Sequence, residues 1–148
     1  MGIIGSHSRR IYFDTNLFIC LVEQNGEFAE FLNALVSEIA ENEQTVFTSE
    51  LSLGECLMGA FKAKSEGLEA VYMDLIAPSA MIKPIAITRQ IITASARLGA
   101  DARMKLPDAI HVATAIAAGC EVFLTNDRGI RAPAPLRVLL LCDLAARW

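Results

Sequence analysis

The sequence predicts an α/β domain in which a central parallel sheet of about five strands is flanked by helices. Short apolar runs alternate along the whole chain with segments of helical periodicity, and this alternation is typical of α/β domains. The apolar runs are nearly continuous, as in strands that are covered on both faces. Because 148 residues suffice for one domain around one core, residues 1–148 are expected to form a single unit.

Five short runs have the length and composition of such buried strands. They comprise residues 10–13, 45–48, 81–85, 121–125 and 137–141. The clearest helical pattern lies between the first two runs, at residues 27–41, where six apolar residues recur at steps of three and four and so share one face. These are Phe28, Phe31, Leu32, Leu35, Val36 and Ile39.

Four more helices are expected further along the chain. They comprise residues 49–63, 68–76, 89–103 and 109–118. Ordinary boundary signals support them, because Pro78 stops one helix, Thr88 is a candidate N-cap and Gly119 ends the last. Pro107 and Asp108 open the last helix, which is small or apolar nearly all round and is therefore expected to lie buried against the sheet.

The composition favours a cytoplasmic protein without a membrane span. Hydrophobic residues make up 53% of the chain, but the longest uncharged stretch, residues 109–120, is shorter than the roughly 18 residues that a membrane helix needs. No signal peptide is recognised, and residues 1–9 are expected to be a disordered or tag-derived segment. The widely spaced cysteines are expected to be reduced core residues. They are Cys20, Cys56, Cys120 and Cys142.

Four acidic residues stand in apolar surroundings at corresponding ends of the predicted elements. Asp14 ends the first strand, Asp127 follows the fourth, Asp108 begins the last helix, and Glu55 lies inside the helix after the second strand. In an open parallel sheet the carboxyl ends of strands on either side of a switch in strand order line one crevice. The four carboxylates are therefore expected to converge there.

Converging carboxylates require a compensating cation. Two of them about 4 to 5 Å apart repel by roughly 3 to 4 kcal/mol at an effective dielectric constant near 20. Oxygen ligands without His or Cys favour Mg²⁺ or Mn²⁺ over zinc. The matching chemistry is metal-assisted hydrolysis of a phosphodiester bond.

Each acidic residue also has a purely structural interpretation. Asp14 and Asp127 could be caps or turn formers, Glu55 could complete a capping box with Ser52, and Asp108 could complement the helix dipole. The joint pattern favours function over four independent structural uses. Two neighbours, Asn16 and Thr125, are assigned supporting roles, because their side chains could orient carboxylates or water. His111 is interpreted as a core or interface residue.

The ordered set of motifs resembles the PIN-domain family, and specifically the VapC-like ribonuclease toxins of type II toxin–antitoxin systems. The motifs are Tyr12-Phe13-Asp14-Thr15-Asn16, Ser49-Glu50-Leu51-Ser52-Leu53-Gly54-Glu55, Leu106-Pro107-Asp108-Ala109-Ile110-His111-Val112-Ala113-Thr114-Ala115 and Leu124-Thr125-Asn126-Asp127. The resemblance implies a three-layer PIN-like fold. It also implies that Asp14, Glu55, Asp108 and Asp127 hold one or two Mg²⁺ or Mn²⁺ ions and that an activated water cleaves RNA.

The resemblance further implies a homodimer and a cognate antitoxin whose tail covers the active site. The chain departs from the family after Asp127, where it has Arg128, Gly129 and Ile130 in place of the usual acidic or aromatic residue. Two alternatives stay open: a catalytically silent PIN-like binding or scaffold module, and a metal-dependent phosphatase. The phosphatase ranks last, because Asn16 stands where its pattern would have a second Asp.

Nine basic residues are candidates for local RNA contacts, although the formal net charge of −4 gives no long-range field to attract a polyanion. They are Arg9, Arg10, Lys62, Lys64, Arg89, Arg103, Lys105, Arg128 and Arg131. The sequence alone assigns no contact to any one of them.

Overall fold

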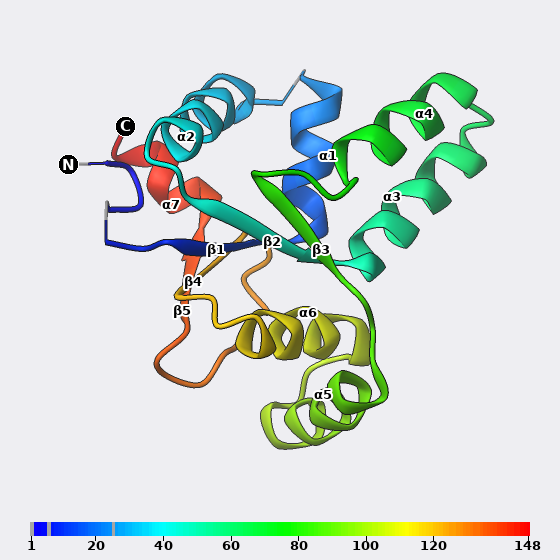
Figure 1. Ribbon diagram of the computed structural model, residues 1–148, viewed down its shortest axis with the longest axis vertical. Helices are drawn as coiled ribbons and strands as arrows, with labels where there is room; N and C mark the ends of the chain where they lie inside the picture. The colour runs from blue at the N-terminus through cyan, green and yellow to red at the C-terminus, as the bar shows by residue number, and fades with distance from the viewer. Residues whose placement is uncertain (1, 6, 25) are drawn as a thin grey trace.

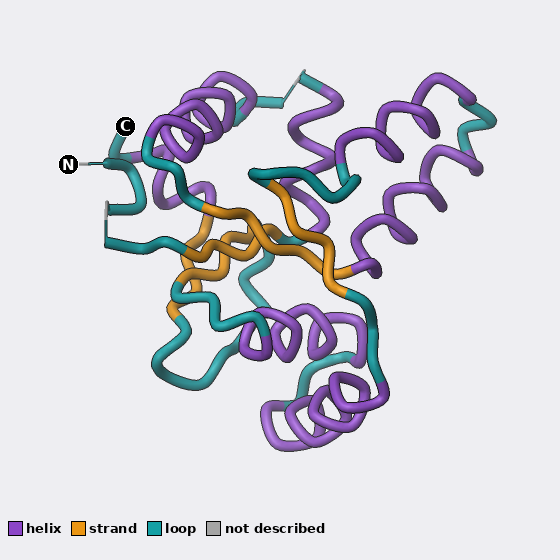
Figure 2. Tube along the Cα trace, viewed as in Figure 1, coloured by secondary structure: helices purple, strands orange, loops and turns teal. Residues whose placement is uncertain are grey.

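The computed structural model describes residues 2–5, 7–24 and 26–148. In this part of the chain, five strands form one parallel sheet in the order β3-β2-β1-β4-β5 (Figures 1 and 2). The strands are β1 (Arg10–Phe13), β2 (Thr45–Ser49), β3 (Ile82–Ile85), β4 (Val122–Thr125) and β5 (Arg137–Leu140). The predicted α/β class and the predicted parallel sheet are confirmed.

Helices cover both faces of this sheet and make it the middle of three layers (Figure 1). In the described residues they are α1 (Thr15–Glu23), α2 (Ala29–Glu41), α3 (Glu50–Lys62), α4 (Glu66–Leu75), α5 (Arg89–Ala102), α6 (Leu106–Ala117) and α7 (Leu141–Ala146). All five predicted helices are present, with boundaries shifted by up to three residues.

The central strand β1 divides the core in two, because successive side chains of a strand point to opposite faces. Ile11 and Phe13 join the larger hydrophobic cluster with residues of α1, α2, α3, α4 and α7, and we call this side the thick face. Tyr12 points the other way, stacks on Phe123 with ring centroids 4.8 Å apart and joins a smaller cluster with α6. That side is the thin face, and Val112 and Ala115 of α6 are fully buried there, as predicted for this helix.

Two helices were not predicted from the sequence. Helix α1 begins directly after Asp14, where the run Leu17, Phe18, Ile19 continues the apolar character of β1 and hides the change of period. Helix α7 begins at Leu141, which the apolar pattern assigned to the last strand. Short apolar runs do not distinguish a strand from a buried helix, so both were missed.

The start of α3 decides one alternative for Glu55. Ser49 is the N-cap, and its hydroxyl accepts a hydrogen bond from the backbone N–H of Leu51 at 3.0 Å. Ser52 therefore lies inside the helix, where it is buried against β2 through a 2.6 Å hydrogen bond to Thr48. The capping box of Ser52 and Glu55 is wrong, and Glu55 is free of that role.

The predicted disorder of residues 1–9 falls partly on Met1 and Ser6, which lie outside the described residues. Elsewhere in this segment Ile4 is buried in the thick-face cluster, and the backbone N–H of Ile3 donates to the Glu38 carboxylate of α2 at 2.6 Å. The four cysteines carry no disulfide. Among the described residues, no helix has the length and apolarity to cross a membrane.

Candidate active site

The strand order reverses at β1, because the chain passes outward from β1 through β2 to β3 and then returns to the other side of β1 with β4 and β5. In open parallel sheets a crevice forms at the carboxyl ends of the strands at such a switch. The carboxyl ends of β1 and β4 lead directly to Asp14 and to Thr125 with Asp127, respectively. This edge of the sheet is where the sequence placed the acidic residues.

Asp14 is the most firmly held of the four acidic residues. Its side chain is the N-cap of α1, with Oδ1 accepting from the Thr15 backbone N–H at 2.8 Å. The Thr125 hydroxyl donates to Oδ2 at 2.7 Å, so the carboxylate also joins the ends of β1 and β4. Asp14 is only 6% exposed. The capping role is therefore real, and it holds the carboxylate in one orientation at the crevice.

Asn16 and Thr125 support this arrangement. The Asn16 amide donates to the Thr125 hydroxyl at 3.3 Å, and its carbonyl accepts the backbone N–H of Asn126 at 3.1 Å. Thr125 is fully buried, and its hydroxyl also accepts the backbone N–H of Asp127 at 3.0 Å. The two side chains thus bind the loop after β4 to the start of α1.

Glu55 reaches the same region from α3. Its Oε1 accepts hydrogen bonds from the Thr15 hydroxyl at 2.7 Å and from His111 Nε2 at 2.8 Å. The hydrogen bond from His111 lowers the pKa of Glu55. Burial raises this pKa, and the hydrogen bond from Thr15 lowers it further. The Glu55 side chain is 40% exposed, so a carboxylate held on one oxygen still faces solvent.

Asp108 lies in the first turn of α6 and is half-buried. Burial raises the pKa of Asp108, and repulsion by Asp127, Asp14 and Glu55 raises it further, against an opposing effect of His111. The other three predicted site residues therefore all disfavour the ionised form of Asp108. A cation would relieve this repulsion.

Asp127 is exposed and forms a turn after β4. Its Oδ1 accepts the backbone N–H of Gly129 at 2.8 Å. A Cβ atom at position 129 would lie 3.2 Å from that same oxygen, so the glycine makes room for the turn. The unusual Arg128-Gly129 sequence thus helps to fix the Asp127 carboxylate.

His111 was interpreted as a core residue, and the structure gives it a place in the site as well. It is 2% exposed, and each ring nitrogen has a partner, with the Tyr12 hydroxyl 2.6 Å from Nδ1 and Glu55 Oε1 2.8 Å from Nε2. A carboxylate only accepts, so we assign the proton to Nε2 and the Tyr12 hydroxyl as donor to Nδ1. The signal in the sequence was the spacing of three from Asp108, which places both residues on one side of α6.

The donor set suits a hard divalent cation, although the described residues hold no ready-made ligand cluster. Within residues 2–5, 7–24 and 26–148, no three His, Cys, Asp or Glu side chains are grouped closely enough to hold a metal ion. The four acids supply only carboxylate oxygens, which Mg²⁺ and Mn²⁺ prefer. The repulsion that raises the pKa of Asp108 is what such an ion would relieve. The chemistry of the donor set therefore fits Mg²⁺ or Mn²⁺, although the side chains are not drawn together around one point.

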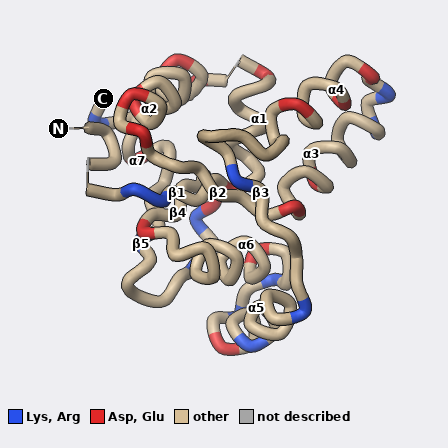
Figure 3. Tube along the Cα trace, in the orientation of Figure 1, with Lys and Arg blue, Asp and Glu red and all other residues tan. Residues whose placement is uncertain are grey.

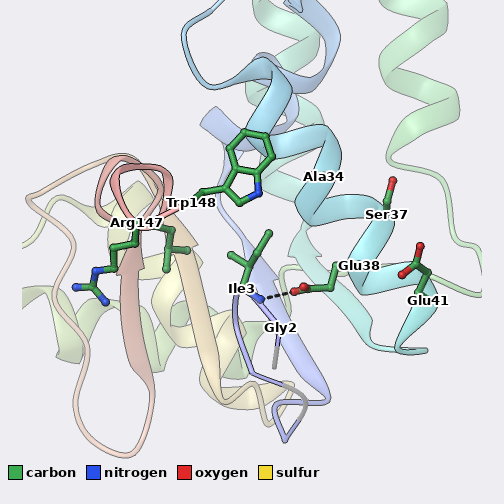
Figure 4. A pocket seen from close by; sticks show the side chains of 9 residues that line it. Gly2, Ile3, Ala34, Ser37, Glu38, Glu41, Arg147 and Trp148 are labelled. Carbon is green, nitrogen blue, oxygen red and sulfur yellow. Dashed lines mark hydrogen bonds between the residues drawn. The ribbon is translucent and has the colours of Figure 1, made fainter.

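A concave region elsewhere on the molecule contains none of these acids. This pocket of about 690 Å³ is formed between α2 and the two ends of the described chain, with Ile3, Glu38 and Trp148 in its wall (Figure 4). The edge of the Trp148 ring packs against Phe31 at a centroid distance of 5.5 Å. The acidic crevice is the stronger functional candidate, because the pKa of Asp108 is raised and that of Glu55 is lowered there.

Comparison with known proteins agrees with this geometry. The sequence model of the PIN domain family matches residues 11–134. No curated protein sequence matches the chain significantly.

Several solved structures are similar over most of their length. A toxin–antitoxin complex from Klebsiella pneumoniae is 27% identical with a TM-score of 0.62, covering 88% of this chain and 97% of that one. VapBC2 from Rickettsia felis, bound to a DNA fragment from its promoter, is 15% identical with a TM-score of 0.70 and coverages of 88% and 98%. The sarcin–ricin loop cleaving toxin VapC20 from Mycobacterium tuberculosis is 16% identical with a TM-score of 0.63 and coverages of 93% and 94%.

The family match spans β1 to the loop before β5 and includes all four acidic residues of the crevice. The similar structures share the three-layer fold around them. The chain therefore belongs to the PIN domain family.

Proposed function

We propose that this protein is a Mg²⁺- or Mn²⁺-dependent endoribonuclease and the toxin of a toxin–antitoxin pair. The observation that carries the proposal is the repulsion by which Asp127, Asp14 and Glu55 raise the pKa of Asp108 at the carboxyl edge of a PIN-domain sheet. The similar structures support it, because they are described as toxin–antitoxin complexes and, in one case, as a toxin that cleaves the sarcin–ricin loop.

In this mechanism the four carboxylates would hold the metal. The chemistry that a bound ion would supply is activation of water and stabilisation of negative charge on the attacking and leaving oxygens of a phosphodiester. Asp14 is the oriented ligand, because its α1 backbone contact and the Thr125 hydroxyl hold both of its oxygens. Asp127 and Asp108 complete the acidic wall from the loop after β4 and from the start of α6.

Glu55 is held by side chains from the other layers. His111 and Thr15 donate to the same oxygen, Oε1, and so leave Oε2 as the oxygen available to the crevice. His111 is oriented in turn by the Tyr12 hydroxyl. This hydrogen-bonded relay of Tyr12, His111 and Glu55 holds the long Glu55 side chain, which would otherwise adopt many orientations in solvent.

The nuclease proposal is tested with purified protein and a labelled RNA in the presence and absence of EDTA. Wild-type protein should cleave only with Mg²⁺ or Mn²⁺, and Asp14→Asn or Asp108→Asn should each lower cleavage by about 10³-fold. Asp74→Asn on the exposed side of α4 is the matched control, because it removes one carboxylate outside the crevice. Undiminished cleavage by both crevice variants would contradict the proposal.

A catalytically silent binding module is the second candidate, because two of the acids have structural partners. Asp14 caps α1, and Asp127 accepts the Gly129 backbone N–H. For this module we expect no RNA cleavage under any metal condition and no increase in melting temperature on adding Mg²⁺. A metal-dependent rise in melting temperature that Asp108→Asn removes favours the enzyme.

We also propose an antitoxin partner and a homodimer. Exposed apolar side chains gather on α3 and α4, with Met58 and Phe61 each 58% exposed and Met73 50% exposed. Such patches are typical of protein interfaces. Phe61→Glu should therefore weaken co-purification with the product of the neighbouring gene. An unchanged complex would contradict the antitoxin proposal.

The homodimer is tested by light scattering, which should give twice the chain mass of 16.1 kDa. A monomer would contradict the homodimer proposal.

A further inference from the structure

We propose that the exposed face of the basic segment, residues 83–107, binds the phosphate backbone of the RNA and guides it to the acidic crevice. This segment comprises the end of the sheet at β3, helix α5 and the start of α6. Its basic residues are Lys83, Arg89, Arg97, Arg103 and Lys105. The inference rests on the proposed ribonuclease function and specifies where its substrate lies.

The basic segment has a positive net charge, whereas the rest of the chain has a negative one. It holds five of the 13 Lys and Arg residues but only one of the 17 Asp and Glu residues, Asp101. Its formal charge is therefore +4, which leaves eight basic and sixteen acidic residues, or −8, for the remainder. The average of −4 thus conceals one strongly positive region, which Figure 3 shows as blue positions along α5.

These five cations are available to a ligand. All five residues are exposed, and the carboxylate ion pairs found among the described residues involve His111 rather than any Lys or Arg. Helix α5 buries only Ile91 and Ser95, because it packs on α6 along one narrow strip. Apart from the half-buried Leu98, Gly99 and Ala102, the rest of its surface faces solvent.

Arginine residues on α5 line a shallow depression that suits a phosphate chain. Its lining residues are Arg89, Gln90, Thr93, Ala94 and Arg97. Eight residues along a helix span about 12 Å, or just over two turns, so the two arginines stand about two turns apart on α5. Guanidinium groups bind phosphate oxygens in a bidentate manner, which makes arginine the preferred residue for this contact.

The basic segment leads directly to the acidic crevice. Lys105 is the N-cap residue of α6, and Asp108 follows three residues later. Helices α5 and α6 lie close together at this point, because a Cβ on Gly99 of α5 would be 3.4 Å from the Ala109 Cβ of α6. An RNA chain repelled by four carboxylates therefore finds the compensating charge beside them.

Four of the other candidate cations either have partners in the protein or lie beside acidic residues. The Arg9 side chain donates to the Asn42 carbonyl, and Arg10 donates to the Ala118 carbonyl at 2.7 Å while lying over the Phe47 ring. Lys62 and Lys64 at the α3–α4 turn are followed at once by Glu66 and Glu69. This contrast favours the basic segment over these four cations.

The test is a fluorescence anisotropy titration of a single-stranded, 2′-O-methylated RNA in EDTA, so that binding is measured without cleavage. The double variant Arg89→Gln/Arg97→Gln should weaken binding at least tenfold at low salt. It should also reduce the slope of log K against log salt concentration by about 1.4, which is the value for two lost phosphate contacts on a single strand. Lys62→Gln/Lys64→Gln removes the same charge elsewhere and should change affinity less than twofold.

Two further binding measurements distinguish the possible outcomes. Arg89→Lys/Arg97→Lys keeps both charges and should retain most of the affinity and the full salt slope. Equal weakening by the two Gln variants, or none by the α5 variant, overturns the inference even if the wild-type protein cleaves RNA. Binding of labelled polyglutamate in place of RNA also overturns it. Failure of the wild-type protein to cleave any RNA under Mg²⁺ instead counts against the proposed function, because binding here is measured without metal.

Discussion

The two faces of the sheet differ in what they bury and in what they leave for function. On the thick face, seventeen buried residues from β1, β2, β4 and most helices pack into one cluster. On the thin face the buried cluster has eight residues, and α5 beyond α6 contributes little to it. The thick face therefore provides most of the stability, while His111, Asp108 and the basic segment lie on the thin face.

The largest expected effect is a loss of RNA cleavage that is accompanied by little change in the free energy of unfolding. Asp14→Asn should lower RNA cleavage by about 10³-fold, because it removes a negatively charged ligand from the proposed metal site. It should change the free energy of unfolding by less than about 1 kcal/mol, since Asn caps helices as well as Asp does. Cleavage assays with denaturant titrations of the same samples measure both quantities. A destabilisation that accounts for all of the lost activity would show that Asp14 is only a cap.

The next prediction compares the two faces directly. Leu35→Ala on α2 should destabilise the protein by about 2–5 kcal/mol, because it leaves a cavity in the fully buried thick-face cluster. Leu98→Ala on the half-buried side of α5 should remove only about 1 kcal/mol. Urea denaturation followed by circular dichroism gives both values. Equal losses would mean that the thin face carries as much stability as the thick one.

A smaller effect is expected from the relay behind Glu55. Tyr12→Phe removes the hydroxyl that orients His111 but keeps the ring stacked on Phe123, so it should destabilise the protein by about 1–2 kcal/mol. Because Glu55 is then less firmly held, kcat should fall roughly tenfold with little change in KM. Tyr72→Phe, a buried tyrosine of the thick face, is the matched control and should leave kcat unchanged. An unaltered kcat in Tyr12→Phe would remove the relay from the mechanism.

The smallest effect concerns the charge of Asp108. A carboxyl group whose pKa is raised in the folded state binds its proton more tightly there, so its ionisation disfavours folding above that pKa. Asp108→Asn should therefore raise the melting temperature of the metal-free protein at pH 7, by less than about 3 °C. The gain should disappear below about pH 4, where the wild-type carboxyl is protonated in both states. Mg²⁺ should stabilise the wild-type protein more than the variant, and a lower melting temperature for Asp108→Asn in EDTA would contradict this account.

Sequence reasoning was most successful where periodicity and burial agree. The strands were recognised because parallel strands buried on both faces are continuously apolar, and α2 because its six apolar residues fall on one face. Helix α1 could not be separated from β1, since the apolar run has no period of its own. The relay was missed for another reason: Tyr12 and His111 are 99 positions apart, and only the fold brings their polar atoms to 2.6 Å.

Successive side chains of β1 point to opposite faces of the sheet. The site is therefore more sensitive to the length of this strand than to the identity of many surface residues. Ile11 and Phe13 anchor one layer, Tyr12 anchors the other, and Asp14 follows at the point where α1 begins. Inserting one residue after Arg10 would turn the anchors toward the wrong layers or carry Asp14 beyond its Thr125 and Leu124 contacts. Variants of this protein should therefore tolerate insertions in the loop before β5 far better than a single added residue in β1.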